Sequence, residues 1–77
     1  MSNQESNKQT FLVVQIIMAR QEIKLGQTNQ FWDTIIRQIN ANNIEEAVGK
    51  FMINTQDIFA VQRLNPIAYE LSRIPFL

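Results

Sequence analysis

The sequence predicts a single all-α domain over residues 1–77, a small compact unit of three to five helices. Apolar residues recur at helical spacing along most of the chain, and Gly, Asn and Pro stand where such helices would begin and end. Hydrophobic residues make up 45% of the chain, which is ordinary for a folded domain and too high for a disordered one. Residues 1–6 are polar and are expected to fray.

The first expected helix spans about residues 6–25. At about 100° per residue, one stripe contains Phe11, Val14, Met18 and Leu25, and a second contains Leu12, Ile16, Ala19 and Ile23. Gly26 then supplies the left-handed residue that commonly ends a helix. A strand over residues 11–17 is the competing interpretation, because Val and Ile favour sheets. The helix is preferred because no second β-rich run is evident that could pair with such a strand.

The second expected helix spans about residues 29–40. Its apolar side chains fall within one arc of a helical wheel: Phe31, Trp32, Ile35, Ile36 and Ile39. This position favours core packing of the two aromatic residues over a role as an anchor in a partner's groove. The asparagine-rich segment 40–43 ends the helix, and Asn43 is expected to cap the next one, with Glu45 and Glu46 in its first turn.

Residues 43–64 are read either as one helix or as two helices broken near 53–55. One long helix would have two apolar faces, the second formed by Ile53, Ala60 and Leu64. Two helices, 44–51 and 55–64, would have a spacing that resembles the helix-turn-helix of bacterial and phage repressors. This resemblance implies an outward-facing recognition helix that reads DNA bases. The segment is net negative, however, and phosphate attraction depends on clustered Lys and Arg, so nucleic acid is disfavoured as a partner.

A short helix over about residues 66–74 completes the prediction. Pro66 suits a first helical position because its missing donor would be unpaired there anyway, and Pro75 would end the helix. Tyr69 falls off the apolar stripe of this helix. The chain then ends on Phe76 and Leu77, an apolar tail that a monomer would have to cover.

The composition excludes most enzyme chemistries. Cysteine and histidine are both absent, which removes thiolate metal sites, disulfides and the commonest general base. The two glycines, Gly26 and Gly49, are too far apart for a phosphate-binding loop. We therefore expect no catalytic residues, cofactor, metal or small-molecule substrate. The apolar run 11–19 is about half the length of a membrane span, so a cytoplasmic protein without a membrane partner is expected.

These observations predict a non-enzymatic protein–protein interaction module, such as a small regulator, adaptor or inhibitor. Seven basic residues balance seven acidic ones, so no charged block indicates a polyanion or polycation as the partner. The surplus of apolar surface predicts a homodimer or a hetero-complex formed through an apolar helical face. The expected contact residues are Ile53, Ala60, Leu64, Tyr69, Phe76 and Leu77. A helix-turn-helix DNA-binding regulator is the alternative.

Overall fold

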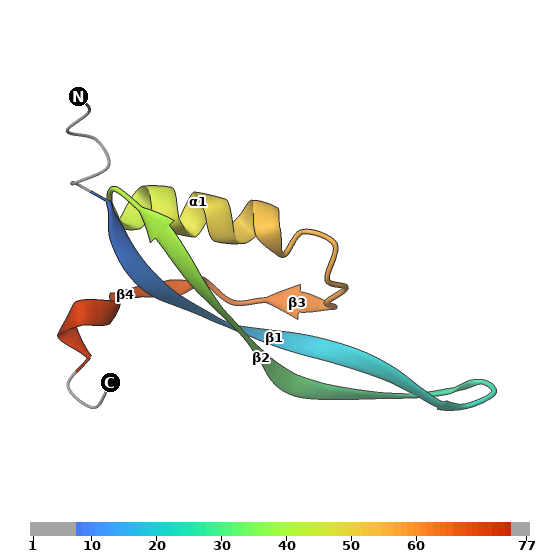
Figure 1. Cartoon of the computed structure of the whole chain (residues 1–77). Coiled ribbons are helices and arrows are strands. Elements are labelled where there is room, and N and C mark those ends of the chain that lie inside the picture. The colour runs from blue at the N-terminus through green and yellow to red at the C-terminus, as the bar shows by residue number, and fades with distance from the viewer. Residues whose placement is uncertain (1–7, 75–77) are drawn as a thin grey trace.

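The computed structural model describes residues 8–74 and shows an antiparallel sheet with one α-helix packed on one of its faces (Figure 1). Strands β1 (Gln9–Lys24) and β2 (Gln27–Ala41) form a long hairpin, and helix α1 (Ile44–Asn54) follows. The chain then returns along the sheet in β3 (Gln62–Arg63), β4 (Ile67–Glu70) and the 3₁₀ helix η2 (Leu71–Arg73). Because β2 pairs with one edge of β1, and β3 and β4 pair with the other, β1 is the central strand.

The predicted all-α bundle is therefore wrong. The expected helices over residues 6–25 and 29–40 are instead β1 and β2, and the strand interpretation of residues 11–17 is confirmed. The partner that this strand needs comes from the segment assigned to the second helix, since Phe11 lies opposite Ile39 and Gln15 lies opposite Ile35. The helices were predicted from the spacing of the apolar residues, and the pairing of two β-rich segments overrides that pattern.

The strand character of β2 was hidden by two charged residues. Ile35 and Ile39 alternate with Asp33 and Arg37 on the face that α1 covers, so this face does not read as a continuous apolar stripe of period two. Asp33 and Arg37 are tolerated there because β2 is at the edge of the sheet, where their side chains reach solvent. Gly26 was expected to end a helix. It forms the hairpin turn with Leu25, at a left-handed φ of 78° that glycine adopts without strain.

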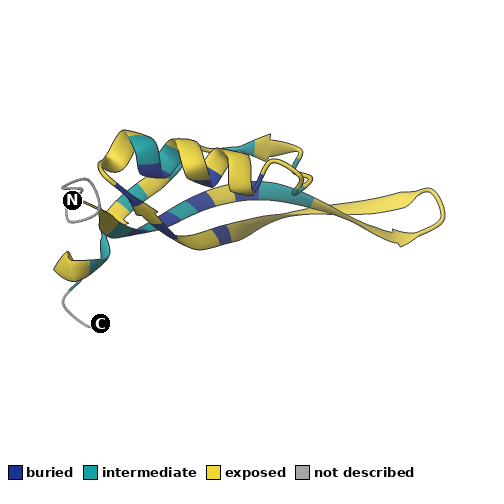
Figure 2. Cartoon of the chain, turned by 45° about the horizontal axis from the view of Figure 1, so that its top comes forward, coloured by how far each residue is buried: buried dark blue, intermediate teal, exposed yellow. Residues whose placement is uncertain are grey.

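The hydrophobic core lies between α1 and one half of the hairpin (Figure 2). Its buried apolar members are Phe11, Val13, Ile17, Ile35, Ile39, Ala41, Ala47 and Phe51. The other half of the hairpin extends beyond this core as an exposed arm, from about residue 19 to residue 32 (Figure 2). The molecule measures 58 × 27 × 16 Å, and its radius of gyration is 15.9 Å. A compact chain of this length would have about 11–12 Å, so the arm makes the monomer markedly elongated.

The C-terminal half also departs from the prediction. Residues 43–64 are neither one helix nor two: α1 ends at Asn54, within the predicted break, and a turn and β3 follow instead of a second helix. The expected helix 66–74 is replaced by β4 and η2, with Pro66 just before β4, where a missing donor is tolerated. The expected cap is confirmed, because the Asn43 side chain accepts a hydrogen bond from the Glu46 N–H. Phe76 and Leu77 lie outside the described residues.

Candidate protein-interaction surface

The sheet has two faces, and α1 covers only one of them. Successive side chains of a strand point to opposite faces, so the burial of Phe11, Val13 and Ile17 against α1 places the residues between them on the other side. The register of β2, β3 and β4 extends this second face across the sheet. We call it the open face, and its apolar members are Leu12, Val14, Ile16, Met18, Trp32, Ile36, Leu64, Ile67 and Tyr69.

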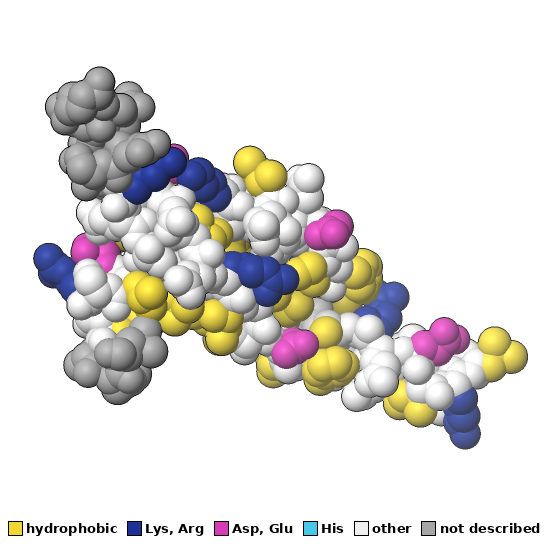
Figure 3. Space-filling view, viewed as in Figure 1, with side chains coloured by type: hydrophobic (Ala, Val, Ile, Leu, Met, Phe, Trp, Pro, Cys, Tyr) yellow, Lys and Arg dark blue, Asp and Glu magenta, His cyan; other side chains and the backbone are white. Residues whose placement is uncertain are grey.

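The open face is apolar, solvent-exposed and almost free of charge. Six of its larger side chains, namely Ile16, Trp32, Ile36, Leu64, Ile67 and Tyr69, are each between 41% and 57% exposed. Its polar neighbours on β1 and β2 are Thr10, Thr34, Gln38 and Asn40, and Asp33 reaches the rim of a shallow depression beside Trp32 and Leu64. Figure 3, which views the molecule from the side as in Figure 1, shows apolar side chains at the surface in several places, including the hairpin tip, and charged side chains of both signs elsewhere on the same view. Contiguous apolar patches of this kind are typical of interaction sites.

The predicted contact residues are only partly brought together. Leu64 and Tyr69 both lie on the open face, Leu64 beside Ile16 and Tyr69 opposite Leu12. Ile53 is 69% exposed but lies on α1, on the other side of the sheet. Ala60 packs against the core and is half-buried, so it presents little surface. Phe76 and Leu77 fall outside the described part of the chain.

Arg63 fixes the returning segment 55–64 and so positions Leu64 on the open face. Its guanidinium donates hydrogen bonds to the carbonyl oxygens of Thr55 (2.8 Å) and Ile58 (2.6 Å), to the Thr55 hydroxyl (3.2 Å) and to Gln15 Oε1 (3.0 Å). Gln15 is buried within the sheet and donates from Nε2 to the Leu64 carbonyl oxygen at 2.8 Å. The only side chain in this network that carries a charge is therefore held by neutral acceptors, which is typical of a structural role and not of acid–base catalysis.

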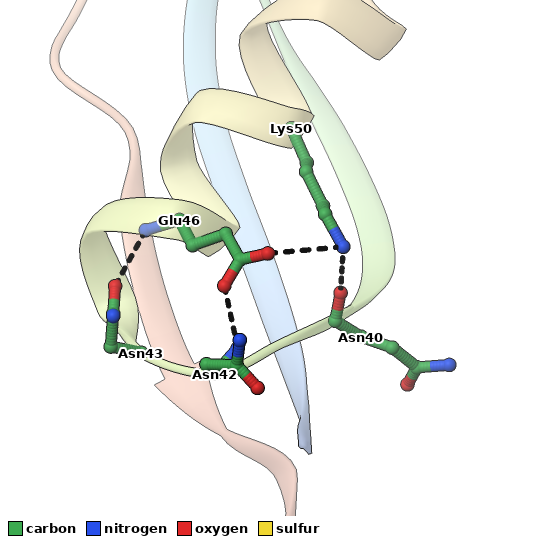
Figure 4. A network of polar contacts seen from close by, with 5 residues as sticks. All are labelled: Asn40, Asn42, Asn43, Glu46 and Lys50. Atoms are coloured by element: carbon green, nitrogen blue, oxygen red, sulfur yellow. Dashed lines mark hydrogen bonds and ion pairs between the residues drawn. The ribbon is translucent and has the colours of Figure 1, made fainter. Parts of the chain in front are cut away.

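A second polar network closes the junction of β2 and α1 (Figure 4). Glu46 accepts a hydrogen bond from the Asn42 N–H, and Lys50 approaches the Glu46 carboxylate at 3.4 Å while donating to the Asn40 carbonyl oxygen. The Asn42 hydrogen bond and then Lys50 lower the pKa of Glu46 from its ordinary value, because both favour the ionised form. With Asn43, this network orients the first turn of α1 on the sheet.

The described residues contain no cluster of three carboxylates that could hold a metal ion. Within the same part of the chain, no helix is long and apolar enough to cross a membrane. The helix-turn-helix geometry needs a second helix over residues 55–64, and these residues instead form a turn and β3. Comparison with protein-family models, with curated proteins and with solved structures gives no match to this chain.

Sequence reasoning missed most of the open face, including Ile16, Trp32, Ile36 and Ile67. The signal that could have found it is the alternation in residues 10–18. Odd positions carry Phe11, Val13, Gln15 and Ile17, and even positions carry Leu12, Val14, Ile16 and Met18. A strand that is apolar on both faces needs cover on both faces, whereas this structure supplies α1 on one side only.

Proposed function

We propose that this chain is a non-enzymatic protein–protein interaction module that binds a protein partner on the open face of its sheet. The observation that carries the proposal is that nine apolar side chains from β1, β2, β4 and the segment before β4 share one uncovered face. Burial of apolar surface is the main favourable term in most protein association. Because the face is nearly uncharged, it favours an apolar surface on the partner over a polyanion such as nucleic acid.

The absence of cysteine and histidine from the whole chain supports a role in binding rather than in catalysis. We propose accordingly that the module uses no cofactor and no small-molecule substrate. A cytoplasmic location is part of the same proposal, and it rests on the cysteine-free composition. A regulator, adaptor or inhibitor would each act through such a surface, and the identity of the partner decides between these three roles.

The test begins with partners retained from a lysate of the native host and then titrates each purified partner against the chain. Trp32 is the only tryptophan and lies on the open face, so its fluorescence reports directly on burial of this face. We expect a partner to shift Trp32 emission to shorter wavelengths. Ile67→Lys should weaken that partner's affinity about 30-fold, which corresponds to about 2 kcal/mol and is the cost typical of a hot-spot residue.

Ile23→Lys is the matched control, because Ile23 is similarly exposed but lies near the tip of the arm, at the irregularity between Glu22 and Lys24 and away from the residues of the open face. Its affinity for the same partner should stay within about threefold of the wild type, the size expected of a residue outside the hot spot. Equal affinities of the Ile67 and Ile23 variants, or binding without a change in Trp32 emission, would place the contact elsewhere and reject the proposal.

A further inference from the structure

The outer edge of β2 is an unpaired strand edge of unusual length. Among the described residues, no strand pairs with β2 on the side away from β1, so this strand of 15 residues leaves the backbone groups of every second residue without a strand partner there. Native proteins block such edges with proline, lysine or a short strand. The β2 sequence has neither proline nor lysine, and its only charged residues are Asp33 and Arg37.

The direction of the backbone groups on β2 follows from the hydrogen bonds of β1. Ile16 and Met18 accept bonds from Leu64 and Val61, so their backbone groups point toward the C-terminal segment. In an antiparallel ladder the intervening residues point the other way, which directs Asp33 and Ile35 of β2 toward β1. Trp32, Thr34, Ile36, Gln38 and Asn40 therefore point their N–H and C=O groups off the free edge.

Side chains cap several of these outward groups. The Thr34 N–H donates to Asp33 Oδ1 at 2.8 Å, and Arg37 Nη1 donates to the Ile36 carbonyl oxygen at 2.9 Å. Lys50 donates to the Asn40 carbonyl oxygen, which keeps a second lone pair free. The two capping residues of β2 stand symmetrically, each two positions from Ile35.

We propose that two copies of this chain pair through their β2 edges, antiparallel about a two-fold axis at Ile35. This register places Asp33 of each copy opposite Arg37 of the other, so the only charged residues of the strand form two opposite-charge pairs. It also places Thr34 opposite Ile36, as a pair whose N–H and C=O groups point at each other. The backbone groups now capped by Asp33 and Arg37 would then bond across the interface, while those two side chains bond to each other.

The same register gives the exposed arm a neighbour. Residues 29–33 of one copy lie alongside residues 37–41 of the other, so Phe31, which is 38% exposed, comes opposite Ile39. A two-stranded hairpin is marginally stable by itself in water, and a third strand stabilises it. A second copy of the chain would therefore supply a third strand beside the part of the arm that precedes Thr34. This contact uses the strand edge and not the open face, so it stands independently of the proposed function.

Sedimentation equilibrium over a range of concentrations tests the pairing. The wild type should dimerise, and Asp33→Arg or Arg37→Asp alone should raise the dimer dissociation constant at least about tenfold, because like charges then face each other twice. The double variant with both substitutions should return to within about threefold of the wild type. Glu22→Arg makes the same change of charge on β1 and should leave the dissociation constant unchanged.

Three outcomes would overturn the proposal. The first is a wild-type chain that stays monomeric up to about millimolar concentration, where even a weak dimer forms. The second is a double variant that fails to recover while its circular dichroism matches the wild type. The third is tighter association of either single variant, which would show that Asp33 and Arg37 prevent pairing of the β2 edge.

Engineered cysteines test the register, because the chain has none of its own. Thr34→Cys and Ile36→Cys chains are mixed in equal amounts and oxidised. Opposed residues of a bonded pair lie about 5.5 Å apart between Cα atoms, which suits a disulfide. The mixed disulfide should dominate. A statistical mixture of the three disulfide-linked products, or no linkage, would contradict this register.

Discussion

Phe51→Ala is expected to lower the free energy of unfolding by about 3–5 kcal/mol, the cost of emptying a fully packed aromatic site. Phe51 is completely buried and is the largest side chain that α1 places in the core. A domain of this length has roughly 4–12 kcal/mol of stability in total. The variant should therefore lose a large fraction of its stability, which urea unfolding followed by far-ultraviolet circular dichroism measures as a lower midpoint.

Phe59→Ala is the matched control for this change. Phe59 is 65% exposed, and its ring lies under the Arg20 guanidinium at 5.5 Å from the ring centroid. Loss of an exposed cation–π contact costs about 0.5–1 kcal/mol. Similar losses for Phe51 and Phe59 would show that α1 does not pack on the sheet as described.

Arg63→Ala is expected to cost about 2–3 kcal/mol, because it leaves acceptors on Gln15, Thr55 and Ile58 without their charged donor. Arg63→Lys should recover only part of this loss, since one ammonium group cannot reproduce the fork of the guanidinium. Urea unfolding measures both variants. Loosening of segment 55–64 should also appear as faster amide exchange at Val61 and Leu64, whose N–H groups bond to β1.

Arg73→Ala provides the comparison for Arg63. Arg73 lies near the C-terminus, its side chain is 80% exposed, and within residues 8–74 its ion-pair partner is Glu70. A surface pair of this kind contributes about 0–1 kcal/mol. If the two arginine variants lose the same stability, the Arg63 network does not hold the returning segment.

The sequence was informative about the breaks between elements and misleading about their type. The turn at Gly26, the junction at Asn40–Asn43 and the end of α1 near Asn54 all fall where the sequence predicts a boundary. Glycine and asparagine act through the backbone conformation of one residue, so their signal survives whichever elements lie on either side. Only α1 was correctly predicted as a helix, over the first part of segment 43–64.

Strands β1 and β2 could not be recognised from the sequence, because each is identified as a strand only once its pairing with the other is known. Residues 31, 32, 35, 36 and 39 fit a helical arc, and the same residues fit the two faces of a twisted edge strand. Asp33 and Arg37 interrupt the apolar residues on one face of β2. This interruption is compatible with a strand only when β2 is known to be an edge strand, so it argued for a helix in the sequence alone. Leu64 and Tyr69 were predicted as contact residues from a helical pattern, and they reach the open face through strand pairing and the returning segment.

Both the open face and the proposed pairing depend on β2 being an edge strand of a sheet, and residue-resolved amide hydrogen exchange across residues 31–39 measures this most directly. At low concentration, the amides of Ile35 and Arg37, which point toward β1, should exchange slowly, and those of Ile36 and Gln38 should exchange rapidly. Raising the protein concentration should slow the exchange of the Ile36 and Gln38 amides, because these amides then bond to a second copy of the chain. Uniform protection of all these amides at every concentration would indicate a helix and contradict the sheet, and rapid exchange of Ile36 and Gln38 at every concentration would contradict the pairing.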